Sequence, residues 1–387
     1  MCDMKKIISL FLAAVLWLSC NVIPAEAALE LTSPSVILIE ASTGQVIYEK
    51  NATEQRAPAS ITKIMTLLLI FEALEEGKIH LKDSVITSEY AAGMGGSQVF
   101  LEEGETQDME TMMKCIVVAS ANDASVAVAE HIAGSEAAFV DLMNKKAVEL
   151  GMVDTHFEDC CGLSDSDLHY TSAKDVAIMS RELITNYPQI YDYTGIWMED
   201  ITHVTQRGSS TFTLSSTNKL IKQYPYTTGL KTGSTSKAKF CISATAHKDD
   251  IDLIAVVMGC ENGKVRFKEA VALLNYGFSV STLYRDENDF ELDKLPIKNA
   301  LENSVGISFK APFVYLDTQN RDLTKVQKVL ELPEQVEAPV KEGDVAGYAV
   351  YFLDGKEIGK TEIIYTENME KATFMDYFKK AFQDMLF

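Results

Sequence analysis

Two pairs of short apolar runs, far apart in the sequence, constrain the fold of this chain most. Residues 36–39 and 45–48 flank the turn-forming stretch Ala41-Ser42-Thr43-Gly44 and therefore predict a β-hairpin. Residues 240–246 and 253–258 have the composition of adjacent buried strands. Because helical segments occupy the sequence between these pairs, we expect one α/β unit whose sheet is closed by distant parts of the chain.

The helical segments in between end at recognisable stop signals. Gly134 and Gly151 each follow an apolar periodic stretch, and Pro188 follows another. The predicted helices span residues 109–119, 124–132, 136–150 and 171–186. Ser120-Ala121-Asn122 interrupts the first two, which places Ser120 and Asn122 on an interhelical turn.

A change in composition marks a second domain. After Arg285-Asp286-Glu287-Asn288-Asp289 the helical periodicity stops. Short alternating runs follow at residues 305–309, 313–316, 348–352 and 362–365. We therefore expect an α/β domain over residues 28–285 and an all-β domain over residues 286–366, with a tight hairpin at Asp354-Gly355.

Both ends of the chain carry segments with their own signals. Residues 1–27 combine a charged start, an apolar run and Ala25-Glu26-Ala27, which predicts a secretory signal cleaved before Ala28 and an exported protein. Lipid attachment at Cys20 is an alternative, but Trp17 and Leu18 suit such a site poorly. Residues 367–387 predict an amphipathic helix rich in aromatic side chains, either packed on the β-rich domain or bound to a membrane surface; we favour the membrane.

Charge and cysteine content exclude several classes of protein. The net charge of −21 over 387 residues excludes nucleic acid as a partner. Five cysteines follow the predicted leader, and Cys160 and Cys161 are adjacent, so the sequence does not predict a disulfide scaffold. The six histidines lack metal-ligand spacing, and we expect no metal or cofactor.

Ser60 and Lys63 form the first candidate site. They lie three residues apart at the start of an apolar helical segment, so one helix face can bring hydroxyl and amine within hydrogen-bond reach. A buried, neutral lysine can take the proton of a serine that attacks a carbonyl. The alternative is an N-cap serine followed by a lysine whose amine reaches solvent.

Two further stretches make the pattern specific. Ser120-Ala121-Asn122 supplies a hydroxyl and an amide, and Lys231-Thr232-Gly233-Ser234 supplies a cation beside a glycine. In this order, S-x-x-K, S-x-N and K-T-G resemble the motifs of the serine penicillin-binding proteins and β-lactamases. The chain is most similar to the low-molecular-mass D-alanyl-D-alanine carboxypeptidases, over nearly its whole length. The matching pieces are residues 57–63, 120–124, 229–233 and 256–260, followed by Arg266-Phe267.

The resemblance implies a fold and a set of roles. The fold would be a DD-peptidase-like α/β domain with an all-β C-terminal domain. Ser60 would form the acyl-enzyme, Lys63 would take its proton, and Ser120 would relay a proton to the departing D-alanine. Lys231 would lie nearby as a cation, and Asn122 would orient Lys63 and the substrate amide.

The remaining implied roles concern substrate binding. The backbone N–H groups of Ser60 and Ser234 would hold the oxyanion, while Thr232 and Arg266 would bind the terminal carboxylate. Ser234 stands where family members often have histidine, and we expect altered rates from this difference. The implied partners are the peptidoglycan stem peptide ending in D-Ala-D-Ala, β-lactams as inhibitors and the outer face of the cytoplasmic membrane.

Three other functions use similar residues. A class A β-lactamase would deacylate through a glutamate, and Glu182 with Asn186 has the spacing of that element, but Thr185 replaces its leucine. A transpeptidase would pass the acyl group to an amine. A non-catalytic peptidoglycan-binding scaffold would keep the fold without turnover.

Overall fold

The computed structural model describes residues 29–205 and 207–384. The predicted leader, its cleavage site before Ala28 and the alternative lipid-attachment site at Cys20 lie outside the described residues. Residues 385–387 of the predicted C-terminal helix lie outside them as well.

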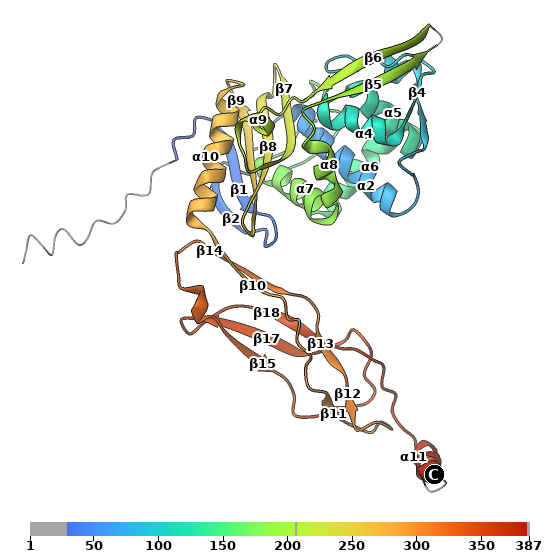
Figure 1. Cartoon of the computed structure of the whole chain (residues 1–387), viewed down its shortest axis with the longest axis vertical. Coiled ribbons are helices and arrows are strands. Elements are labelled where there is room, and N and C mark those ends of the chain that lie inside the picture. The colour runs from blue at the N-terminus through green and yellow to red at the C-terminus, as the bar shows by residue number, and fades with distance from the viewer. Residues whose placement is uncertain (1–28, 206, 385–387) are drawn as a thin grey trace, which may run out of the picture. The chain divides into compact units, whose positions relative to one another are not determined.

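A five-stranded antiparallel sheet forms the centre of the first domain (Figure 1), in the order β2-β1-β9-β8-β7. Its strands are β1 (Ser35–Glu40), β2 (Val46–Lys50), β7 (Thr227–Thr235), β8 (Lys239–Lys248) and β9 (Ile251–Cys260). The hairpin predicted at residues 36–48 pairs with β9, for example Ile37 opposite Val256. The prediction that distant parts of the chain close one sheet is confirmed.

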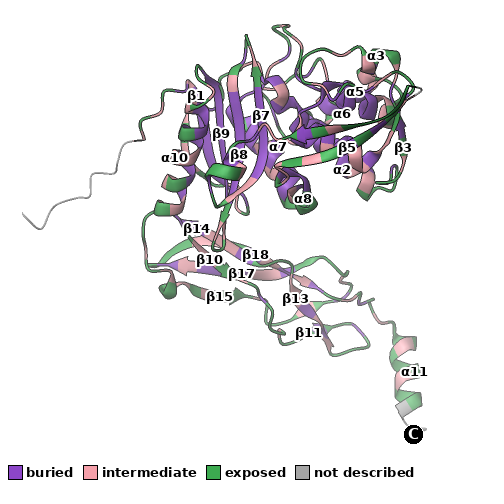
Figure 2. Ribbon diagram, turned by 45° about the horizontal axis from the view of Figure 1, so that its top comes forward, coloured by how far each residue is buried: buried purple, intermediate pink, exposed green. Residues whose placement is uncertain are grey.

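Both faces of the central strands β1 and β9 are covered, which explains their nearly unbroken apolar sequences (Figure 2). Ile37 and Ile39 belong to a core shared with the helices α2 (Lys63–Glu75), α4 (Met109–Val118), α5 (Asn122–Ala133), α6 (Glu136–Glu149) and α7 (Ala173–Asn186). Leu38 points to the other face. There it approaches Gly277 of α10 (Val265–Val280), where a Cβ would lie 2.9 Å from the Leu38 side chain.

The four predicted helices are present with boundaries shifted by a few residues. Ser135 and Ser172 accept hydrogen bonds from backbone N–H groups at the starts of α6 and α7, and Gly134 ends α5 in the left-handed conformation at φ 82°. Neither α10 nor the hairpin of β5 (Met198–Thr205) and β6 (Gly208–Ser215) was predicted from the sequence. Shorter elements connect these parts: β3 (Ser84–Ile86), α3 (Glu89–Ala92), β4 (Thr106–Asp108), η2 (Pro188–Ile190), α8 (Tyr191–Thr194) and α9 (Leu220–Gln223).

The C-terminal part is rich in strands and has its own apolar core. The strands are β10 (Thr282–Asp286), β11 (Leu295–Lys298), β12 (Ser304–Val305), β13 (Ile307–Phe309), β14 (Phe313–Asp317), β15 (Gln327–Glu331), β16 (Val336–Glu337), β17 (Val345–Leu353) and β18 (Lys356–Tyr365), with the short helix η3 (Leu323–Lys325). β17 and β18 form the predicted hairpin around Asp354 and Gly355, which both have positive φ. β10 pairs with β14 and begins before the composition change at Asp286.

The described part of the C-terminal helix is α11 (Phe374–Asp384). Residues before it extend along the β-rich domain, because Met369 pairs with Val340 and is buried in that domain's core. Among the described helices, none has the length and apolar character needed to cross a bilayer.

Candidate active site

Ser60 lies on a single turn, η1 (Ala59–Thr62), that leads directly into α2. The preceding residue, Ala59, has a φ of 49°, a conformation that residues with a Cβ rarely adopt. Gly162 packs against this turn so closely that a Cβ there would lie 1.8 Å from the Ala59 carbonyl oxygen. Pro58, not Ser60, holds the N-cap position, so the alternative of a capping serine is wrong.

Lys63 is fully buried and surrounded by oxygen atoms. Its Nζ lies 3.2 Å from Ser60 Oγ, 2.6 Å from Asn122 Oδ1 and 2.8 Å from the Cys161 carbonyl oxygen. No carboxylate in the described part of the chain forms an ion pair with it, and burial lowers the pKa of Lys63. The structure thus brings together the hydroxyl and amine that the three-residue spacing predicts.

Ser120 lies on the turn between α4 and α5, as predicted, whereas Asn122 is already the first residue of α5. Ser120 has a φ of 60°, and the Asn122 N–H donates to the Ser97 carbonyl at 2.7 Å. Asn122 Nδ2 donates to the Gly95 carbonyl, also at 2.7 Å. These two bonds hold the amide so that its oxygen points to Lys63.

Lys231 reaches the same place from the edge strand β7. Its Nζ donates to Ser120 Oγ at 2.8 Å and to the Thr232 carbonyl at 3.0 Å. Burial, and then the neighbouring cations Lys63 and Arg266, lower the pKa of Lys231 well below its usual value. Two buried amines in one cluster therefore disfavour each other's charge, which modifies the expectation of Lys231 as a simple fixed cation.

Gly233 brings β7 against the nucleophile turn. A Cβ at Gly233 would lie 2.9 Å from the Pro58 carbonyl oxygen and 3.0 Å from the Ser60 backbone nitrogen. Only a residue without a side chain permits this approach. The next residue, Ser234, is exposed at the edge of the sheet.

Thr232 and Arg266 have different hydrogen-bond partners. The Thr232 hydroxyl donates to Thr217 Oγ1 at 2.7 Å. Arg266, from α10, donates through Nη1 to the carbonyls of Gly233 at 2.9 Å and Cys241 at 3.0 Å. It is only 9% exposed, and burial lowers its pKa. Arg266 is therefore anchored on the backbone of β7 and β8 and is not a loose surface residue.

A loop over residues 158–164, which no sequence pattern predicts, supports both Ser60 and Lys63. Asp159 accepts hydrogen bonds from the backbone N–H groups of Cys161 and Gly162, and the Cys161 carbonyl holds Lys63. His169 secures this loop to the turn: its Nδ1 accepts from the Glu158 N–H at 3.0 Å, and its Nε2 lies 2.9 Å from Thr62 Oγ1. Main-chain acceptors leave no side-chain pattern, so no sequence signal pointed to them.

Other candidate groups lie in different settings. Asn186 donates to Glu182 at 2.6 Å within α7, and no hydrogen bond connects either residue with Ser60 or Lys63 among the described residues. The thiols of Cys115, Cys160, Cys161, Cys241 and Cys260 are all buried and free. Glu136, Asp159 and Cys161 approach one another within 4.8 Å, but backbone N–H groups and Tyr90 already bind the two carboxylates, so we assign no metal to them.

A covered antiparallel sheet, with a buried helix whose first turn touches the edge strand, defines the class of fold shared by DD-peptidases and serine β-lactamases. Within that class, the chain belongs to the D-alanyl-D-alanine carboxypeptidase family, whose sequence profile matches residues 22–262. A second profile, the C-terminal domain of penicillin-binding protein 5, matches residues 278–371. The predicted family and the predicted two-part fold are confirmed.

Individual relatives agree with the profiles. The chain is 41% identical over 353 residues to the D-alanyl-D-alanine carboxypeptidase DacF of Bacillus subtilis, covering 90% of this chain and 89% of that protein. It is 31% identical to DacC of Escherichia coli over 91% of this chain and 89% of the relative. Penicillin-binding protein 5 of Haemophilus influenzae superimposes with a TM-score of 0.75 at 29% identity, covering 88% of this chain and 98% of that structure.

Proposed function

We propose that this protein is a serine-type D-Ala-D-Ala carboxypeptidase that removes the terminal D-alanine from peptidoglycan pentapeptides. The observation that carries the proposal is the contact of Ser60 Oγ with the fully buried Lys63 amine. Burial lowers the pKa of Lys63 and so favours the neutral amine, which is the form that can accept the Ser60 proton.

In the acylation step, Ser60 Oγ attacks the carbonyl carbon of the penultimate D-alanine, and its proton passes to Lys63. The backbone N–H groups of Ser60 and Ser234 stabilise the oxyanion, because their positions are fixed before the reaction. Collapse of the intermediate breaks the carbon–nitrogen bond. The departing D-alanine nitrogen takes a proton through Ser120, which the contact with Lys231 Nζ at 2.8 Å supports.

Deacylation then adds water to the Ser60 ester and returns the shortened peptide with a free carboxylate. Penicillin enters the same route, but opening of its lactam ring leaves no small fragment to depart, so its ester with Ser60 is the expected inhibited form. Thr232 and Arg266 are the proposed ligands of the terminal carboxylate, and Asn122 orients the peptide.

The decisive test combines turnover with covalent labelling. The purified protein should release D-alanine from a pentapeptide ending in D-Ala-D-Ala, and penicillin should add one acyl group detectable in the intact mass. Ser60→Ala should abolish both, because no other hydroxyl in the cluster contacts Lys63. Ser234→Ala is the matched control: it keeps the backbone N–H, so the adduct should persist. An adduct on the Ser60→Ala protein would refute the assignment of the nucleophile.

A transpeptidase is the second candidate, because the same acyl-enzyme can react with an amine in place of water. Adding D-amino acids or an amine acceptor to the pentapeptide assay separates the two, since transfer gives a longer product. The β-lactamase alternative needs a glutamate that activates water for deacylation. Glu182 instead accepts a hydrogen bond from Asn186 within α7, which does not support that role.

We further propose that the protein is exported and associates with the outer face of the cytoplasmic membrane through α11. Phe374 is 83% exposed, and Met375, Tyr377, Phe378 and Phe382 are also exposed. Phe374, Phe378 and Phe382 recur every four residues and therefore share one face of the helix. Because Lys379 and Lys380 are offset by acidic residues, burial of this apolar face would dominate binding.

A further inference from the structure

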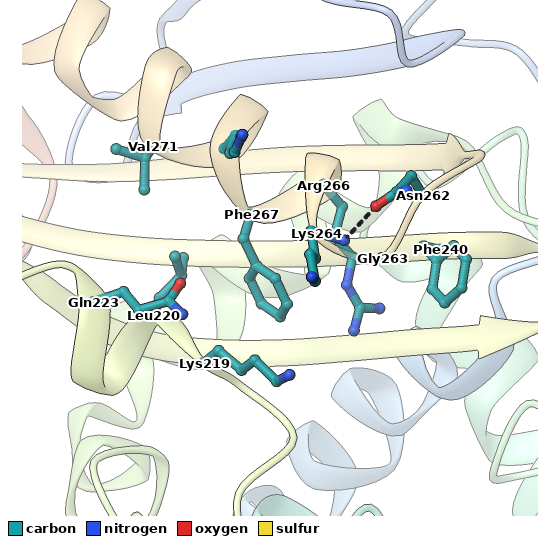
Figure 3. Close-up of a pocket in the computed structure, with 11 residues that line it drawn as sticks. Lys219, Leu220, Gln223, Phe240, Asn262, Gly263, Lys264, Arg266, Phe267 and Val271 are labelled. Atoms are coloured by element: carbon teal, nitrogen blue, oxygen red, sulfur yellow. Dashed lines mark hydrogen bonds between the residues drawn. The ribbon is translucent and has the colours of Figure 1, made fainter.

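A cavity of about 830 Å³ lies between α9 and the first turns of α10, on the face of the sheet that α10 covers (Figure 3). Its lining residues come from α9 and the residue before it, from β8, from the loop between β9 and α10, and from α10. None of Ser60, Lys63, Ser120 or Lys231 is among them. The cavity is therefore separate from the acylation cluster, although Arg266 borders both.

Cations surround this cavity in an otherwise acidic protein. Lys219 lies immediately before α9, and Lys264 immediately before α10 (Figure 3). Lys268 also lines the cavity, one turn further along α10. All three are exposed, and none forms an ion pair with a carboxylate within the described residues. Since the whole chain carries a net charge of −21, three unpaired lysines around one cavity create a local positive potential.

The start of α10 adds to this potential. The helix has 16 residues and no acidic residue in its first turn, so no carboxylate there offsets the positive end of its dipole. The side chain of Asn262 accepts hydrogen bonds from the Lys264 and Val265 N–H groups. Arg266 lies in that first turn and lines the cavity at 9% exposure. Its Nη1 donates to two carbonyls, but its Nε is buried with no hydrogen-bond partner.

The cavity walls between these cations are apolar. Phe240 and Phe267 flank the Arg266 guanidinium, with ring centres 5.5 Å and 4.7 Å from its central carbon. Leu220 and Val271 line the cavity as well. A small inorganic ion would leave these surfaces in water, whereas a ligand with an apolar part would cover them.

We propose that this cavity binds a multiply charged organic anion, with phosphate or carboxylate groups on Lys219, Lys264 and Lys268 and an apolar part on Phe240 and Phe267. The site does not depend on the acyl-enzyme chemistry proposed for Ser60. Arg266 donates hydrogen bonds to the carbonyls of Gly233 and Cys241. A ligand in the cavity would therefore be linked through Arg266 to the strand at the substrate-binding edge.

The test is direct binding to the full-length protein, measured by calorimetry with phenyl phosphate and with phthalate as probes, because each is a dianion that carries an apolar ring. Sodium chloride at matched ionic strength is the reference, because it screens charge without providing a multivalent ligand. We expect a dissociation constant of about 1 mM or lower for at least one probe. Tighter binding of phenyl phosphate would assign the site to phosphate ligands, and tighter binding of phthalate to carboxylates.

Two triple variants decide whether the cavity is responsible. Lys219→Gln with Lys264→Gln and Lys268→Gln should weaken binding at least about tenfold, since each exposed charge contributes a few-fold. Lys78→Gln with Lys145→Gln and Lys174→Gln removes the same charge from exposed lysines elsewhere and should change binding less than about twofold. Thermal unfolding checks that both proteins are folded. Equal loss in the two triples, or no binding to the parent protein, would overturn the proposal.

Discussion

At the scale of single residues, Arg266 has two separable tasks. One is visible: its Nη1 supports the carbonyls of Gly233 and Cys241. The other, binding the terminal carboxylate, is proposed. If the second holds, Arg266→Gln should lower kcat/KM for a peptide ending in D-Ala-D-Ala by about one to two orders of magnitude, since hydrogen bonds to charged groups contribute roughly 1.5–3 kcal/mol.

The matched substrate for this prediction is the same peptide with its C-terminus as an amide. Loss of carboxylate recognition should affect the acid much more than the amide, and release of D-alanine or D-alaninamide measures each. Equal losses on both peptides would mean that Arg266 acts only by supporting β7.

His169 predicts a pH dependence of stability. Its Nδ1 accepts from Glu158 N–H, so the ring is neutral, and burial lowers its pKa from the usual 6.5. At a pH below that usual value, the imidazole binds a proton more readily in the unfolded chain than in the folded protein. The free energy of unfolding therefore decreases as the pH is lowered. His169→Gln removes this effect. Denaturant unfolding at about pH 7.5 and pH 5.5 should therefore show a smaller acid-induced loss for the variant than for the parent.

The charged groups around His169, namely Glu158, Asp159, His156 and Lys237, are present in both proteins, so their contributions cancel in the comparison. The exposed His80→Gln is the control and should keep the parental pH dependence. If His169→Gln loses stability in parallel with the parent as the pH falls, the imidazole is not the group responsible.

The sequence predicts contacts between residues that lie within one helical turn of each other. The spacing of Ser60 and Lys63 sets their contact within one turn, and no tertiary information is needed. The loop that completes their surroundings could not be predicted, because Cys161 contributes a backbone carbonyl from 98 residues away and Thr62 meets His169 from 107 residues away. Such contacts are set by the packing of elements.

At the scale of elements, the approach of β7 to η1 depends on Gly233. Gly233→Ala places a Cβ within 3.0 Å of backbone atoms of Pro58 and Ser60, so the strand or the turn must move. A displacement of about 1 Å at a reacting group can cost a hundredfold in rate. We expect acylation by a fluorescent penicillin to slow at least about tenfold while the protein remains folded, as circular dichroism can verify.

Gly195→Ala is the comparison for this prediction. A Cβ there meets only the Tyr191 carbonyl at 3.6 Å, an ordinary contact, and Gly195 has no unusual φ. Its acylation rate should match the parent. Normal acylation of Gly233→Ala would show that β7 has room that the structure does not suggest.

The elements that the sequence does not predict have weak hydrophobic periodicity. In the β5–β6 hairpin only Ile201, His203 and Leu214 are buried, so there is little apolar alternation to detect. α10 buries Arg266 and Glu269 among its apolar residues, and those charges break the expected stripe. By contrast, Gly134 indicates the end of α5 from the sequence alone, because glycine readily adopts the left-handed conformation that ends a helix.

At the scale of the whole molecule, the C-terminal helix can be removed without opening the β-rich core. Met369 belongs to that core and the Ala372 N–H donates to the Asn299 carbonyl, so deletion should begin at residue 373. The truncated protein should release D-alanine at the parental rate. It should also leave the membrane pellet, because three phenylalanines each contribute roughly 1.5–3 kcal/mol when buried.

A full-length variant separates membrane binding from packing. Phe374→Ser with Phe378→Ser and Phe382→Ser keeps the bond from Tyr377 to the Ala300 carbonyl but removes the apolar face. It should also lose membrane binding, by more than about tenfold in flotation with lipid vesicles. If either variant still binds vesicles like the parent, α11 is not the anchor.

The fold also decides where a proton can travel at Lys63. An ammonium group has three hydrogens, one for each of Ser60 Oγ, Asn122 Oδ1 and the Cys161 carbonyl. A neutral amine keeps two, and the amide oxygen and the carbonyl can only accept, so both hydrogens stay with them. The lone pair must then face Ser60, the one partner with a hydrogen to give. Two acceptors that take no part in the chemistry thus fix the direction of transfer.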